Sequence, residues 1–136
     1  MIRQVLVVPK GIALDCFYIM NQFVDVNGAI LDHICDSVGK GQAVMFVDEK
    51  PNGFLTGFLT GHVSDGVGYV QNLYVDKRYH RCGIGGTLLD AYQNYCVGNK
   101  VKQIMLTTRP TQQAINFYVK NGFVQTSINK LMQKSL

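Results

Sequence analysis

The chain has 136 residues and a net charge of +4 at pH 7, with 47% apolar and 16% charged residues. This composition excludes a disordered or fibrous protein, and no apolar run approaches the roughly 20 residues of a membrane span. The length suits one domain, so we expect a single domain over residues 1–136. Because the first residues lack the pattern of a signal peptide, we also expect a cytoplasmic protein with no membrane partner.

The first half of the sequence predicts four strands and two helices. In chain order these are a strand, two helices and three strands, over residues 2–8, 11–23, 27–39, 42–47, 54–62 and 68–75. Pro9 ends the first strand, and Asn27 and Gly39 are suited to begin and end the second helix. The short, turn-rich connections between the last three strands predict antiparallel hairpins.

The second half of the sequence alternates helices with strands. It predicts a helix, a strand, a helix and two short strands, over residues 83–97, 101–108, 111–121, 123–127 and 130–134. Gly98 and Gly122 follow the two helices and are typical stop signals. The complete order indicates an α/β (α+β) protein with a central mixed, mostly antiparallel sheet and helices on both faces.

The cysteines and histidines show neither a metal-binding nor a disulfide pattern. Cys16, Cys35, Cys82 and Cys96 are irregularly spaced without a Cys-x-x-Cys motif, and the three histidines are scattered. A zinc site usually needs closely spaced pairs of such ligands. We therefore expect free thiols in a reducing compartment and no metal.

The basic residues form one short cluster, in which Lys77, Arg78 and Arg81 lie beside a glycine-rich turn. A nucleic-acid-binding protein usually presents a broader basic face with interleaved aromatic residues. The cluster therefore favours a small phosphorylated ligand and argues against a nucleic-acid partner.

The glycine-rich turn reads YHRCGIGGTLL from Tyr79 to Leu89 and joins a predicted strand to a predicted helix. Glycines allow the backbone to approach a ligand closely, and the first turn of a helix offers unpaired N–H groups to a phosphate. A P-loop is excluded because Gly-Lys-Ser/Thr is lacking, and Leu88 and Gln103 stand where a dinucleotide fingerprint needs a small residue and an acid. By itself, Gly-x-Gly is explained equally well by a plain turn that starts a helix.

Two segments together resemble the GCN5-related N-acetyltransferase (GNAT) family. The segment from Leu73 to Leu89 is similar to the family's acetyl-CoA signature, and AINFYVKNGF, over residues 114–123, is similar to its helix with a tyrosine before Gly-Phe. Two positions depart from the family pattern. His80 stands where the family usually has Gln or Arg, and Thr111 stands where it often has Asn.

The resemblance implies an acyltransferase that moves an acetyl group from acetyl-CoA directly to a primary amine, which is a small amine, a peptide N-terminus or a lysine. It implies that the backbone of Leu73 and Val75 pairs with the pantetheine and that Tyr118 donates a proton to the leaving thiolate. It also implies that backbone amides hold the pyrophosphate, namely those of Arg81, Cys82, Gly83, Gly85 and Gly86. Dimers are common in the family, so the resemblance admits a homodimer.

Two alternatives stay open on the sequence. Tyr118 shares a helix face with Ala114 and Phe117 and could pack in the core. The chain could also be a catalytically weak acetyl-CoA-binding module that acts through protein contacts. The strand over residues 68–75 offers no carboxylate, so we expect the acceptor amine to lose its proton through ordered water held by Gln71 or Asn72.

One further feature of the sequence, a group of aspartates, concerns the binding of the acceptor. The segment from Gly11 to Gly39 has four aspartates and no lysine or arginine, namely Asp15, Asp25, Asp32 and Asp36. In the resembled family this segment walls the acceptor site. The sequence therefore leaves two interpretations, an acidic wall that attracts a cationic amine and a solvated acidic face.

Overall fold

The computed structural model describes residues 1–108, 111–126 and 131–136. Its strands are β1 (Ile2–Val5), β2 (Val44–Glu49), β3 (Leu55–Ser64), β4 (Val67–Val75), β5 (Gln103–Thr107), β6 (Val124–Gln125) and β7 (Leu131–Ser135). Its helices are α1 (Lys10–Met20), α2 (Gly28–Gly39), the short 3₁₀ helix η1 (Lys77–Tyr79), α3 (Ile84–Gly98) and α4 (Gln112–Lys120). The sequence predicted this order apart from η1. Ser127 and Lys130, at the ends of the last two predicted strands, lie outside the described residues.

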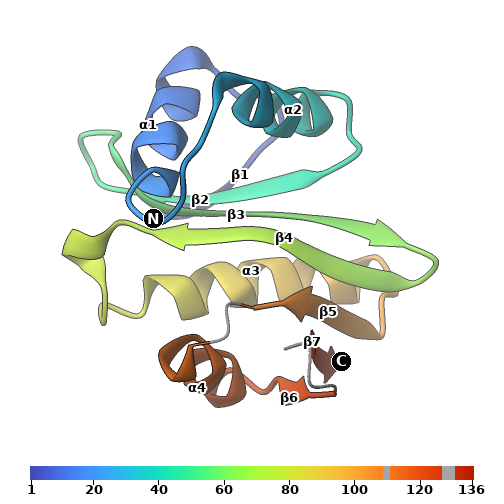
Figure 1. Ribbon diagram of the computed structural model, residues 1–136. Helices are drawn as coiled ribbons and strands as arrows, with labels where there is room; N and C mark the ends of the chain where they lie inside the picture. The colour runs from blue at the N-terminus through green and yellow to red at the C-terminus, as the bar shows by residue number, and fades with distance from the viewer. Residues whose placement is uncertain (109–110, 127–130) are drawn as a thin grey trace.

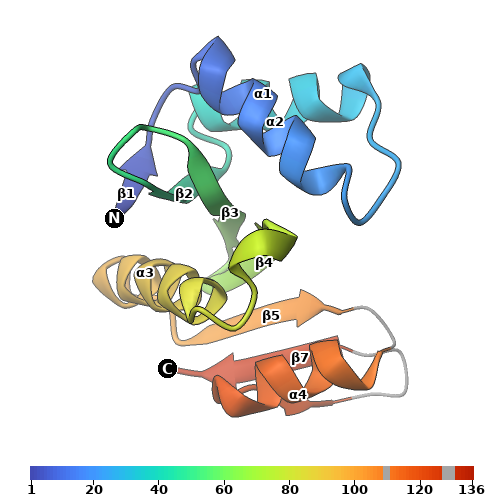
Figure 2. The same cartoon turned by 90° about the vertical axis from the view of Figure 1, so that its left-hand side faces the viewer.

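The seven strands form one open sheet in the order β1-β2-β3-β4-β5-β7-β6 (Figure 1). Strands β4 and β5 run parallel, and all other neighbours run antiparallel. Helices α1 and α2 cover one face of the sheet, and α3 and α4 lie on the other (Figure 2). The expected mixed sheet with helices on both faces is confirmed.

Strand β3 lies at the centre of the molecule and is buried from both sides. Phe58 and Leu59 are consecutive, so their side chains point to opposite faces, and both are 0% exposed. Phe58 belongs to the core beneath α1 and α2, and Leu59 belongs to the core beneath α3. Burial on both faces fixes the register of β3, because a slip of one residue would exchange the two cores.

The start of α2 follows its sequence signal, and the two predicted glycine stops lie at or within one residue of the observed helix ends, although neither glycine is the left-handed residue. Asn27 Oδ1 accepts a hydrogen bond from the backbone N–H of Ile30 at 2.9 Å and caps α2. Helix α2 runs through Gly39, however, and the left-handed residue that follows it is Gly41, with φ +73°. Helix α3 likewise includes Gly98, and Lys100 carries the positive φ. A glycine near a helix end therefore locates the stop to within one residue without itself being left-handed.

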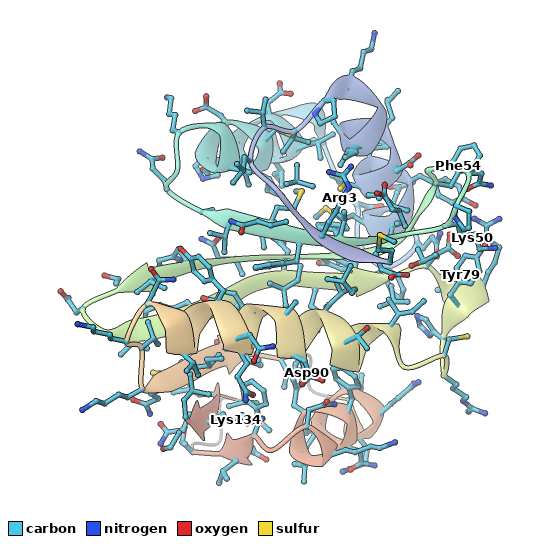
Figure 3. The ribbon with its side chains drawn as sticks, turned by 180° about the vertical axis from the view of Figure 1, so that it is seen from behind. Arg3, Lys50, Phe54, Tyr79, Asp90 and Lys134 are labelled. Carbon is cyan, nitrogen blue, oxygen red and sulfur yellow. The ribbon has the colours of Figure 1, made fainter. Side chains whose placement is uncertain are left out.

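The connection from β4 to α3 is anchored through η1. The backbone N–H of Lys77 donates to Gln22 Oε1 at 2.9 Å, and Lys50 Nζ lies 4.3 Å from the centre of the Tyr79 ring. Figure 3 shows Lys50 and Tyr79 close together, near Phe54 in the β2–β3 turn. The α1–α2 connection and the β2–β3 turn thus hold the segment that precedes the glycine turn. Among the described residues, no helix is both long and apolar enough to cross a membrane.

Candidate active site

Strands β4 and β5 separate and leave a cleft between them. They are paired over three residues each, Val67–Tyr69 and Gln103–Met105, but β4 continues to Val75 and β5 to Thr107. A cleft of about 770 Å³ lies where they separate, and it is lined by both strands, the glycine turn, the start of α3 and helix α4. This arrangement brings the two sequence segments that were recognised separately to opposite walls of one space.

The backbone of β4 presents polar groups to this cleft. Asp76 donates its backbone N–H to Thr56 at the start of β3, at 2.8 Å. Because alternate residues of an antiparallel strand bond to the same side, Leu73 and Val75 direct their N–H and C=O groups away from β3. The carbonyl of Val75 accepts a hydrogen bond from His80 Nε2 at 2.9 Å. Since a carbonyl only accepts, Nε2 carries the imidazole proton in this contact.

The glycine turn aims the start of α3 at the cleft. Gly83 precedes the first residue of α3 with φ +79°, a left-handed conformation that favours glycine. Arg81 also has a positive φ, +65°. Both residues line the cleft together with the first turn of α3. The orphan N–H groups and positive dipole end of a helix start make this wall suited to an anion.

Gly85 and Gly86 have a second role that the sequence analysis missed. A Cβ atom on Gly85 would lie 2.9 Å from Cζ of Phe117, and one on Gly86 would lie 3.2 Å from Oδ1 of Asn121. Both partners belong to α4 or to its end. The glycines therefore allow α3 and α4 to pack closely, in addition to lining the cleft. A larger residue at either position would act first on this packing.

Arg78 is held by an ion pair, which corrects the expectation that it supplies mobile charge to a phosphate. Its Nη2 lies 2.9 Å from Asp76 Oδ2 and its Nε lies 3.2 Å from Asp76 Oδ1. Asp76 is only 1% exposed. These hydrogen bonds hold the pKa of the Asp76 carboxyl below its usual value. The pair fixes the start of η1 and does not reach the cleft lining.

Lys120 is a cleft residue that sequence reasoning missed. Arg81 and Lys120 are the two cationic side chains among the described cleft-lining residues. Residues Gln113, Phe117 and Lys120 of α4 all line the cleft, and their spacing of four and then three places them on one helix face. This spacing, counted from Phe117, is the signal that could have identified Lys120.

Tyr118 both lines the cleft and packs against aromatic neighbours. Its ring meets Phe117 at a centroid distance of 5.0 Å and Phe123 at 5.6 Å, with both contacts edge-on. Phe123 is buried and Tyr118 is half-buried. The packing interpretation and the functional one are therefore compatible, because core contacts fix the ring while the residue borders the cleft.

Seven of the eight sequence-predicted site residues line the cleft: Leu73, Val75, Arg81, Gly83, Gly85, Gly86 and Tyr118. Cys82 is the exception, since it is exposed and its Sγ lies 3.7 Å from the carbonyl oxygen of His80. Among the described residues, no three His, Cys, Asp or Glu side chains are grouped so that they could hold a metal ion.

A bulge in β4 borders the cleft on the side of α2. Thr60 pairs with Asn72 and Gly61 with Val70, so Gln71 is the extra residue of β4. Asn72 Nδ2 donates to Thr60 Oγ1 at 2.8 Å. The described cleft lining contains no aspartate or glutamate, so the bulge supplies uncharged amide groups at this point.

Two of the four aspartates of the first 39 residues interact with other groups of the chain. Asp36 pairs with Lys40, whose Nζ lies 2.9 Å from Oδ2, and this lysine follows directly after the segment from Gly11 to Gly39. Asp15 Oδ2 accepts a hydrogen bond from the backbone N–H of Leu55 at 3.3 Å. These contacts favour the solvated-face interpretation for Asp36 and a structural role for Asp15.

The chain matches the family described as "Acetyltransferase (GNAT) family" over residues 14–123. No curated protein matches the chain. A solved GNAT-family acetyltransferase from Staphylococcus aureus is similar, with a TM-score of 0.83 and 17% identity, covering 100% of this chain and 99% of that chain.

Two further solved structures are similar. The ribosomal-protein-S18-alanine N-acetyltransferase from Escherichia coli has a TM-score of 0.78 and 18% identity, covering 99% of this chain and 94% of that chain. The PaiA N-acetyltransferase from Thermoplasma acidophilum was solved in complex with coenzyme A. It has a TM-score of 0.70 and 16% identity, covering 100% of this chain and 99% of that chain. At these identities the three structures establish the fold.

Proposed function

The chain belongs to the GNAT family of acetyltransferases, and we propose that it transfers an acetyl group from acetyl-CoA directly to a primary amine. The observation that carries this proposal is the cleft between β4 and β5, which the glycine turn, the free side of β4 and Tyr118 all line. Small amines, peptide N-termini and lysine side chains are the three acceptor classes.

The cleft walls fit the parts of acetyl-CoA. The backbone of Leu73 and the N–H of Val75 would pair with the pantetheine, because β4 directs these groups away from β3. The amides of residues 81–86 would hold the pyrophosphate at the start of α3, and Arg81 and Lys120 would add positive charge. The open space around a Cβ at Gly83 is consistent with a close approach at that residue.

The proposed chemistry needs a proton donor and a polarising group. The amine nitrogen attacks the thioester carbonyl, and a backbone N–H of β4 stabilises the negative charge that develops on its oxygen. Tyr118 donates its phenolic proton to the departing thiolate as the carbon–sulfur bond breaks, since an ordinary phenol has a pKa near 10 and carries its proton at neutral pH. Bound acetyl-CoA supplies the activated acetyl group and the leaving thiol.

The competing function is a catalytically weak acetyl-CoA-binding module that acts through protein contacts. It is favoured by the lack of a carboxylate among the described cleft-lining residues. It is opposed by the position of Tyr118 on the cleft wall. The two functions make different predictions about turnover but the same prediction about binding of acetyl-CoA.

An acceptor screen separates them. The panel contains tyramine, spermidine, Nα-acetyl-lysine amide and a peptide with a free N-terminal alanine, and tyrosol serves as the alcohol matched to tyramine. Release of CoA is followed by chromatography, because a thiol-reactive dye would also label the exposed Cys82. We expect turnover with at least one amine and none with tyrosol. Binding of acetyl-CoA without turnover of any amine would support the binding module.

A cytoplasmic location and a homodimer are part of this proposal. The location is supported by the four free cysteines, which are typical of a reducing compartment, and the dimer by its frequency in the family. Fractionation of cells that express the tagged chain tests the location. Light scattering of the purified chain, with and without acetyl-CoA, tests the dimer.

A further inference from the structure

A second pocket lies on the α2 side of the sheet, next to the bulge of β4. Its volume is about 80 Å³, and α2, the start of β2, β3 and β4 line it through His33, Ile34, Ser37, Ala43, Thr60, Gln71 and Asn72. Gln71 and Asn72 also line the large cleft. The same two residues therefore border both spaces, so the pocket adjoins the cleft at the bulge.

The polar groups of this pocket suit ordered water. Thr60 is 1% exposed, and its Oγ1 accepts from Asn72 Nδ2. A hydroxyl that accepts one hydrogen bond still has its own proton to donate. The pocket volume exceeds the roughly 10–15 Å³ that one water needs, so water can satisfy the Thr60 proton and the carbonyl oxygens of the neighbouring amide side chains.

His33 is the titratable residue of this pocket. It lies on α2, lines the pocket and is otherwise exposed to solvent. The other charged groups near it on α2 are Asp32 and Asp36, and Asp36 is paired with Lys40. Among the described residues that line the pocket, the sheet contributes the uncharged hydroxyl and amide groups given above. A ring nitrogen of imidazole can accept a proton and pass it on, and His33 borders the pocket on one side and solvent on the other.

We propose that His33 accepts the proton of the acceptor amine through water held in this pocket. The inference rests on the proposed function. When the amine nitrogen bonds to the acetyl carbon, the carbon–sulfur bond breaks and the thiolate takes a proton from Tyr118. The N–H proton of the amine passes through the pocket water to the imidazole of His33 and then to solvent. Tyr118 regains its proton from solvent, so the cycle consumes acetyl-CoA and amine and yields acetyl-amine and CoA.

The decisive variant is His33→Gln, which keeps a polar side chain and removes the titratable group. We compare kcat/KM with wild type from about pH 6 to about pH 10, using the amine of the panel that gives the fastest turnover. We expect a loss of about 100-fold near pH 7, the low end of the range for general acid–base catalysis. The loss should shrink as pH rises, because hydroxide then removes the proton without help. Imidazole added to His33→Ala should restore part of the rate.

The matched control is His62→Gln, the same substitution at a histidine of β3 that lines neither the pocket nor the cleft. Its pH profile should be that of wild type. Calorimetry with CoA shows whether each variant keeps the folded cofactor site. Equal profiles for His33→Gln and wild type overturn the relay, and so does a loss that is the same at every pH and not rescued by imidazole. If wild type turns over no amine, the proposed function fails and the relay fails with it.

Discussion

The imidazole of His80 donates a hydrogen bond from Nε2 to the carbonyl oxygen of Val75, 2.9 Å away. The same ring stacks on Phe23 of the α1–α2 connection at a centroid distance of 5.7 Å, with the ring planes 13° apart. His80 thus ties the start of the glycine turn to the strand proposed to hold the pantetheine. It stands where the resembled family usually has Gln or Arg, and it reaches β4 with a ring nitrogen.

From this contact we predict that His80→Ala weakens the binding of CoA by about fivefold to tenfold. The loss corresponds to one neutral hydrogen bond of about 1 kcal/mol, which in wild type fixes the turn relative to β4 before the ligand arrives. His80→Gln, which retains a donor, should recover part of the affinity. Calorimetry with CoA measures both variants. Tighter binding by His80→Ala would contradict the prediction and show that the imidazole competes with the ligand for the Val75 carbonyl.

A second prediction concerns the buried end of the Asp76–Arg78 pair. Asp76→Asn removes the charge that receives hydrogen bonds from the Arg78 backbone and guanidinium. We expect the free energy of unfolding at pH 7 to fall by about 1 kcal/mol. This is less than a fully buried charged hydrogen bond contributes, because Arg78 is largely exposed and water competes for it.

The pH dependence of this effect has a definite sign. Arg78 holds the folded-state pKa of Asp76 below its unfolded value, so the stabilisation is present above about pH 4. It is lost as the pH falls through the folded-state pKa. Urea unfolding of wild type and Asp76→Asn should therefore differ at pH 7 and converge towards acid pH. Asp36→Asn, which breaks the exposed Asp36–Lys40 pair, is the control and should change stability little at either pH.

The third prediction separates packing from ligand binding at Gly85. Gly85→Ala places a methyl group against Phe117, and overpacking of this kind costs about 1–3 kcal/mol of stability. Gly85→Ala combined with Phe117→Leu should regain part of that loss, since leucine lacks the outer ring atoms. Gly39→Ala is the control, because Gly39 is helical and nothing lies within 4 Å of its added Cβ. It should raise stability by about 0.5–1 kcal/mol. Urea unfolding measures all three, and equal stabilities for Gly85→Ala and wild type would contradict the packing argument.

The sequence predicted the elements well where the signal was local. Asn27 capped its helix as expected because capping involves residues three positions apart. The predicted stop at Gly39 is the last residue of α2, and the helix predicted to end at residue 97 runs one residue further, through Gly98. Neither glycine is the left-handed residue, which comes two positions later in both cases. Helix η1 was missed because it depends on Asp76, Gln22 and Lys50, which come from different parts of the chain.

Most of the predicted site residues line the cleft, but the sequence did not show the geometry that brings them together. Tyr118 and Gly83 were recognised from two motifs, and the structure adds that they line one cleft. The pairing of Arg78 with Asp76 could not be read from the basic cluster, because a charge pattern does not show which carboxylate is buried. The pocket beside His33 depends on the bulge at Gln71, and such a bulge follows from the register between strands and not from either strand alone.

The last prediction concerns Tyr118, whose proposed task is to protonate the leaving thiolate. Tyr118→Phe removes one hydroxyl and keeps the ring in its edge-on contacts with Phe117 and Phe123, so the fold and the affinity for CoA should be nearly unchanged. The single-turnover rate of acetyl transfer should fall by about 10²-fold or more, the range for a general acid.

Tyr92→Phe is the matched control for Tyr118→Phe, because it also removes a phenolic hydroxyl. The Tyr92 hydroxyl lies 2.8 Å from the carbonyl oxygen of His62 and 2.9 Å from that of Tyr69, away from the cleft lining. Its loss should lower stability by about 1–2 kcal/mol, because the single phenolic proton that these two part-buried carbonyls share is removed, and should leave the transfer rate close to that of wild type. The two variants are therefore expected to show opposite patterns, one in rate and one in stability. An unchanged transfer rate in Tyr118→Phe would show that Tyr118 serves only in packing. Weaker CoA binding with no change in rate would show that its hydroxyl contacts the ligand and is not a proton donor.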